Sequence, residues 1–74
     1  MDVNNLINMA NQIGVFFESM PDRQQALHDL ASHIRRFWDP RMRRTLLDSM
    51  EHDKAEGMSD IVRQALSTHR QWLT

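Results

Sequence analysis

The stretch richest in chemically active side chains is residues 33–44, HIRRFWDPRMRR, which places five arginines around an Asp-Pro pair. A guanidinium can donate two parallel hydrogen bonds to a carboxylate or a phosphate, so this stretch predicts a contact with an acidic group. The helix dipole favours cations at a helix C-terminus but not in a first helical turn. Arg35 and Arg36 therefore have a partly structural explanation, whereas Arg41 and Arg43 indicate an acidic surface on a partner.

Two aromatic residues lie immediately before the same Asp-Pro pair. Large rings at this position can bury the junction between two helices, or they can offer one edge to a partner protein. We expect Phe37 to lie in the core, and for Trp38 core and interface remain open. The partner-binding residues predicted from this stretch are Arg35, Arg36, Trp38, Arg41, Arg43 and Arg44.

The remaining reactive side chains form no catalytic or metal-binding pattern. The chain contains no cysteine, which excludes thiolate metal ligands and a cysteine nucleophile. No two of the four histidines stand four residues apart, the spacing that places two imidazoles on one helical face. The two glycines form no phosphate-binding loop, and the acidic residues between positions 48 and 56 are typical of a solvated face. We therefore predict no catalytic residue, no metal and no cofactor on this chain.

Length and charge indicate one small domain with a specific contact area. A chain of 74 residues buries only about 60% of the surface that its unfolded form exposes, so association with a partner is expected. Net charge is −1, and residues 33–44 hold five of the nine basic residues, so the basic charge is local and the chain lacks the strongly basic character of a nucleic-acid-binding domain. No apolar segment approaches the roughly 18 residues of a membrane span. We expect a cytoplasmic chain with no membrane partner.

Apolar side chains recur at helical spacing in four segments, at about residues 3–20, 22–38, 40–51 and 60–72. Asp39 suits an N-cap and Pro40 a first helical position, while the polar segment 52–58 with Gly57 predicts a loop. The alternation typical of strands does not occur. The sequence therefore predicts an all-α fold, a small bundle of three to four short helices forming a single domain over residues 1–74.

The first predicted helix has an unusually broad apolar face. Met9 and Phe16 widen its apolar stripe, which indicates that the helix is covered from two sides. Gly14 costs helix stability but lets another backbone approach closely. The partner-binding residues predicted in this helix are Met9, Ile13, Gly14 and Phe16.

Two motifs resemble a known family. NLINMANQIGVFFESMPDR at residues 5–23 and HIRRFWDPRMRRTLL at residues 33–47 together resemble the small delta subunit of soluble NAD-dependent, molybdenum-containing formate dehydrogenases. The resemblance implies a noncatalytic accessory subunit that docks on the catalytic (alpha) subunit of a hetero-oligomeric complex and supports its assembly or stability. It also implies that larger subunits hold the molybdenum pterin cofactor, the iron–sulfur clusters, FMN and the NAD site.

A function of another class stays open at this point. The same arginines would suit a small helical module that binds a phosphate or a nucleotide. Co-purification of the chain with larger formate dehydrogenase subunits would distinguish the two hypotheses.

Overall fold

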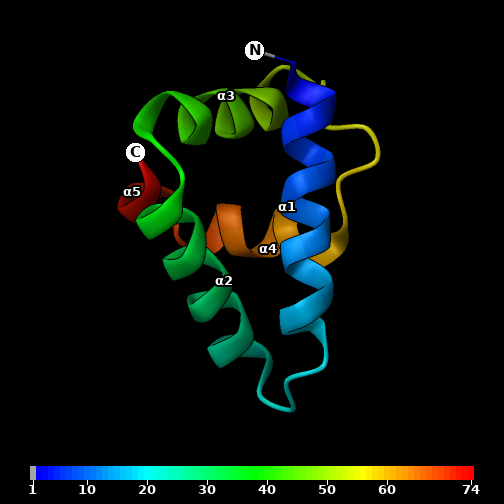
Figure 1. Ribbon diagram of the computed structural model, residues 1–74, viewed down its shortest axis with the longest axis vertical. Coiled ribbons are helices and arrows are strands. Elements are labelled where there is room, and N and C mark those ends of the chain that lie inside the picture. Colours follow the sequence, from blue (N-terminus) through cyan, green and yellow to red (C-terminus); the bar gives the residue numbers. More distant parts are fainter. Residues whose placement is uncertain (1) are drawn as a thin grey trace.

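The computed structural model describes residues 2–74, and the predicted all-α fold class is confirmed. The part described contains no strand and five helices: α1 (Val3–Glu18), α2 (Arg23–Phe37), α3 (Pro40–Glu51), α4 (Asp60–Thr68) and α5 (Arg70–Leu73). Helices α1 and α2 form two arms that meet at the loop joining them, and α3 crosses the opposite end (Figure 1). Helix α4 packs against both arms. None of these helices is long and apolar enough to cross a membrane.

An aspartate caps the N-terminus of each of the first three helices. The Oδ1 atoms of Asp2, Asp22 and Asp39 accept the backbone N–H groups of Asn4 at 3.0 Å, Gln25 at 3.2 Å and Met42 at 3.0 Å. Each carboxylate satisfies a backbone donor that has no partner inside the helix, and its charge is favoured by the helix dipole. The beginnings of α1, α2 and α3 are therefore specified by local sequence.

The turn between α1 and α2 is longer than the sequence pattern suggests. Helix α1 ends at Glu18, where the backbone N–H of Met20 closes the last turn on the carbonyl of Phe17 at 3.1 Å. Pro21 lies in the loop, because Asp22 takes the capping position and Arg23 becomes the first helical residue.

The fourth predicted helix, residues 60–72, is divided at His69 into α4 and α5. The N–H of His69 still bonds to the carbonyl of Ala65 at 3.0 Å, but its own carbonyl accepts from both Trp72 and Leu73 in a new, short turn. This change of direction returns Leu73 to the core, where only 1% of it is exposed. The free energy gained by burying the Leu73 side chain outweighs the free energy that a straight continuation of α4 would contribute.

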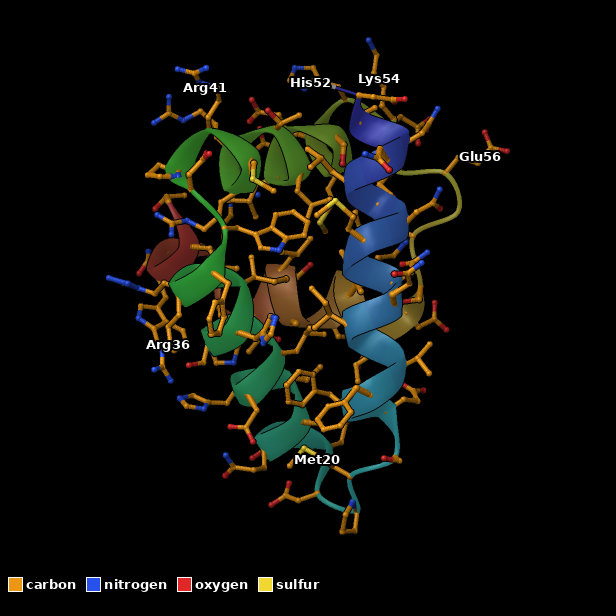
Figure 2. All side chains as sticks on the ribbon, viewed as in Figure 1. Met20, Arg36, Arg41, His52, Lys54 and Glu56 are labelled. Carbon is orange, nitrogen blue, oxygen red and sulfur yellow. The ribbon has the colours of Figure 1, made fainter. Side chains whose placement is uncertain are left out.

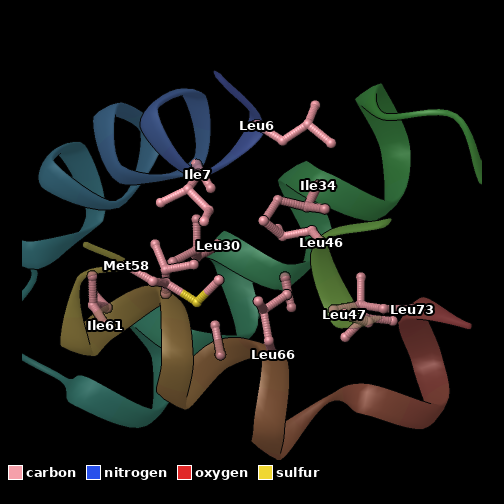
Figure 3. Close-up of a cluster of buried hydrophobic side chains, with 14 of the residues drawn as sticks. Leu6, Ile7, Leu30, Ile34, Leu46, Leu47, Met58, Ile61, Leu66 and Leu73 are labelled. Carbon is pink, nitrogen blue, oxygen red and sulfur yellow. The ribbon is translucent and has the colours of Figure 1, made fainter. Parts of the chain in front are cut away.

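One hydrophobic core receives side chains from all five helices. Leu6 and Ile7 come from α1, and Leu30 and Ile34 come from α2 (Figure 3). Leu27 of α2 also belongs to the core, and the remaining large aliphatic residues come from α3, α4 and α5: Leu46, Leu47, Ile61, Val62, Leu66 and Leu73. Because each helix covers this cluster with one face only, its opposite face is exposed to solvent.

Helix α1 is joined to the loop at residues 52–59 by the side-chain amide of Asn11. Its Nδ2 donates to the carbonyl of Gly57 at 2.8 Å, and its Oδ1 accepts the backbone N–H of Ser59 at 2.9 Å. One turn further along α1, a Cβ on Gly14 would lie 3.0 Å from Cγ2 of Ile61 and 3.1 Å from Cγ2 of Val62. Glycine therefore permits the close approach of α1 to the start of α4.

We predict that Asn11→Ala lowers the free energy of unfolding by about 1–3 kcal/mol, since it removes two long-range hydrogen bonds and leaves the Ser59 N–H without its acceptor. Asn8→Ala on the exposed side of the same helix is the matched control and should change stability by less than about 0.5 kcal/mol. Urea denaturation followed by circular dichroism measures both. Equal stability of the two variants would contradict the role assigned to Asn11.

Candidate partner-binding surface

The arginines around the Asp39-Pro40 pair are divided between internal and external positions. Arg43 faces inward. Its Nη1 donates to the carbonyls of Arg35 at 2.7 Å and Trp38 at 3.2 Å, and its Nε donates to the carbonyl of Leu73 at 3.2 Å. These carbonyls lie at or beyond the C-terminal ends of α2 and α5, where the helix leaves acceptors unsatisfied. The guanidinium of Arg43 thus ties α3 to two other helix ends.

The other four arginines of this stretch are exposed. The guanidinium carbon of Arg35 lies 5.6 Å from the ring centroid of Trp72, and that of Arg36 lies 5.9 Å from the ring centroid of Phe37. Arg41 and Arg44 border an open depression next to Asp39 and Pro40. Within residues 2–74 none of these four guanidinium groups forms an ion pair with a carboxylate. Figure 2 shows Arg36 and Arg41 pointing away from the body of the molecule.

The two aromatic residues before the turn differ in burial. Phe37 was expected in the core, and this expectation is wrong, because 70% of the residue is exposed. Trp38, predicted as a partner-binding residue, is 6% exposed and belongs to the core. The backbone at Trp38 leaves the helix for an extended conformation with φ −96° and ψ 138°. The indole of Trp38 packs in the core, while Phe37, the last residue of α2, is left exposed.

The four candidates in α1 are divided in the same way. Met9 and Phe16 are 37% and 74% exposed, so their side chains are open to a partner. Ile13 is half-buried and packs against the core, and Gly14 is buried against Ile61 of the same chain. The close approach expected at Gly14 is therefore made by α4, inside the protein.

The structure joins Phe16 to Arg36 through a continuous row of rings. Phe16 meets Phe17 edge to face at 5.2 Å between centroids, Phe17 meets His33 at 6.2 Å, and His33 meets Phe37 at 4.7 Å. We call Phe16, Phe17, His33 and Phe37 the aromatic strip. Burying one phenylalanine side chain contributes roughly 1.5–3 kcal/mol, so the exposure of Phe16 and Phe37 leaves considerable free energy available to a partner.

The outer face of α1 continues this strip and carries almost no charge. Its exposed residues are Asn4, Asn5, Asn8, Met9, Gln12, Val15, Phe16 and Glu18, of which only Glu18 is charged. Depletion of charge together with exposed Met and Phe is the composition found at the centre of protein interfaces. An ordinary solvated helix face would carry lysine and glutamate instead.

Of the four residues of the strip, sequence reasoning named only Phe16 as a partner-binding residue. His33 and Phe37 stand four residues apart and so share one face of α2, a signal that the sequence does contain. Phe17 is adjacent to Phe16 in sequence, but its contact with His33 depends on how α1 and α2 pack. Only the three-dimensional fold could bring that pair together.

A second aromatic cluster lies on another part of the surface and holds the C-terminal helix in place. The Trp72 ring stacks on His28 at 5.3 Å and 22°, and His69 meets both rings edge to face. His28 and Arg35 are two turns of α2 apart, and both contact this indole. In the part of the chain described, no three His, Asp or Glu side chains gather as a group that would hold a metal ion.

Fold and surface together define a small all-helical protein with an exposed aromatic strip and exposed arginines. The sequence profile of the NADH-dependent formate dehydrogenase delta subunit family, FdsD, matches residues 5–66, and the chain belongs to this family. The resemblance found in the two sequence motifs is thereby confirmed. Comparison with curated proteins and with solved structures gave no match.

We predict that Arg43→Ala destabilises the free chain by about 1.5–3 kcal/mol, because it removes charge-assisted hydrogen bonds to three carbonyls. Arg41→Ala, two residues away on the exposed side, should change stability by less than about 0.5 kcal/mol. Thermal melts of the two variants measure the difference. If both variants have the melting temperature of the wild type, the hydrogen bonds of Arg43 contribute nothing to stability.

Proposed function

We propose that the chain is a noncatalytic accessory subunit of an NAD-dependent formate dehydrogenase complex, and that it docks on the catalytic (alpha) subunit. Membership of the FdsD family is the observation that carries this proposal. Docking supports the assembly or the stability of the complex, in which the larger subunits oxidise formate to carbon dioxide and reduce NAD. The complex is assigned to the cytoplasm.

The surface supports docking as the role of this chain. Phe16 and Phe37 are large aromatic residues left exposed on a very small protein, and aromatic residues and arginine are the most frequent anchors of protein interfaces. Arg36 lies over the ring of Phe37, and Arg41 and Arg44 are exposed beside the Asp39-Pro40 turn. None of the three has an acidic partner within residues 2–74. An acidic surface on the catalytic subunit would supply those partners.

The proposed complex needs cofactors that the residues of this chain do not fit. The sequence contains no cysteine to ligate an iron–sulfur cluster, and no three acidic or histidine side chains of residues 2–74 converge on a metal position. We therefore assign the molybdenum pterin cofactor, the iron–sulfur clusters, FMN and NAD to the other subunits. The phosphate- or nucleotide-binding alternative gains no support, because the family match assigns the chain to the formate dehydrogenase delta subunits.

Co-expression of the tagged chain with the larger subunits tests the proposal. We expect the purified chain alone to show no formate-dependent NAD reduction, and the co-expressed chain to retain the catalytic subunit on the affinity column. A complex prepared without the chain should lose activity faster on warming, because an apolar surface on the catalytic subunit is then uncovered. Formate turnover by the isolated chain, or recovery of the chain free of all larger subunits, would contradict the proposal.

A further inference from the structure

We propose that the aromatic strip, together with Arg36, is the central contact with the catalytic subunit, and that it receives a segment presenting a large apolar side chain beside a carboxylate. This inference rests on the proposed function and names the chemistry of the partner segment. Three observations carry it: the depression in the surface, the packing of the rings around it, and its charge.

The surface contains a depression of the size of a side chain. Phe17 forms its wall on α1, and Asp29, Ser32, His33, Arg36 and Phe37 form its wall on α2, around a cavity volume of about 260 Å³. Pockets for small molecules and cofactors are larger and more enclosed, at roughly 300–1,000 Å³. The depression therefore suits one or two side chains of a protein partner, which would meet the rings of Phe17 and Phe37 and polar groups between them.

The rings around this depression are already arranged for contact. His33 holds the ring of Phe37 at 4.7 Å between centroids, and Phe17 holds the ring of Phe16 at 5.2 Å and 89°. Each exposed ring is thus supported from behind by a partly buried one. Such supported aromatic side chains lose little conformational entropy on binding, which favours their use as anchors.

The charges around the strip favour contact with a carboxylate of the partner. Arg36 lies over the ring of Phe37 without an acidic partner in the described part of the chain. Asp29, the one acidic residue that lines the depression, accepts from Gln25 at 2.8 Å and lies 3.3 Å from Nδ1 of His28. Glu18 at the end of α1 is paired with Arg23 at 2.9 Å. Glu18 and Asp29 therefore already have partners within the chain, whereas Arg36 has no ion pair among the described residues.

The same charges disfavour a second copy of this chain as the occupant. Two copies meeting through the strip would bring two Arg36 side chains to one contact, while each Asp29 already accepts a hydrogen bond from Gln25. Juxtaposed like charges oppose association. A segment of different sequence, with an acidic residue next to an apolar one, meets no such opposition.

Binding of the full-length chain to a complex of the larger subunits purified without it tests this inference. Phe37→Ala and Phe16→Ala should each weaken binding by roughly tenfold or more, because aromatic anchors dominate interface energetics. Phe37→Leu, which keeps an apolar side chain, should recover most of the affinity lost in Phe37→Ala.

Arg36→Glu should weaken binding by roughly tenfold and Arg36→Lys much less, and the contribution of Arg36 should fall as salt is raised. Lys54→Glu makes the same change of charge far from Arg36, as Figure 2 shows, and should leave the affinity within about twofold. Circular dichroism of each variant verifies that the fold is intact. The effect of Phe37→Ala should persist at high salt, since it reports apolar contact.

The outcomes separate the two proposals. If the wild-type chain does not bind the larger subunits at all, both fail. If it binds and the variants at Phe16, Arg36 and Phe37 bind equally well, docking stands and the aromatic strip is excluded as its centre. If the wild type dimerises in sedimentation and Phe37→Ala abolishes only dimerisation, the strip binds a second copy and the inference is overturned.

A photocrosslinker identifies the partner segment directly. With p-benzoylphenylalanine in place of Phe37, we expect crosslinks to one segment of the catalytic subunit that contains a large apolar residue and an adjacent aspartate or glutamate. Crosslinks to a segment without acidic residues would refute the proposed chemistry of the partner.

Discussion

The contact between α1 and the start of α4 fixes the rotation of α1, and the exposed surface depends on that rotation. Asn11 is bonded to the backbone of Gly57 and Ser59, and Gly14 allows Ile61 to approach to van der Waals contact. Side chains on a helix are rigidly related in angle, so holding Asn11 and Gly14 inward turns Phe16 outward. The bonds of this amide act together with the buried side chains of Leu6, Ile7 and Ala10 to set which residues of α1 remain exposed.

Arg43 shows how a cation in an unfavourable place for the helix dipole can still have an internal explanation. It lies in the first turn of α3, where the dipole opposes positive charge, yet three carbonyls at the ends of other helices converge on its guanidinium. Such carbonyls lack partners within their own helices. The arginine-rich stretch thus combines one residue that organises the fold with neighbours that face solvent.

This division extends to both motifs that mark the family. Ala10, Asn11 and Gly14 of the first motif, and Trp38 and Arg43 of the second, hold the helices together. Phe16, Arg36 and Phe37 project from the same motifs and meet along one row of rings. A chain of this size cannot cover all its aromatic residues in its own core, and as a subunit of a complex it does not need to.

The sequence by itself determined the helices and the family. The periodicity of apolar residues, the capping by Asp39 and the polar loop around Gly57 depend on interactions over a few residues, and the structure shows all three. The two motifs also sufficed for the resemblance to the formate dehydrogenase delta subunit, which the family match confirms.

Tertiary structure decided which side of each helix is buried and which candidates meet. The sequence could not assign Trp38 to the core or Phe37 to the surface, because burial at the end of α2 depends on how the other helices pack around it. It could not show that Arg43 has internal acceptors, since these belong to residues 5 to 30 positions away along the chain. The approach of Phe17 to His33 likewise requires the packing of α1 on α2. Contacts between distant residues form only when the helices pack around one core, and a local sequence pattern does not predict them.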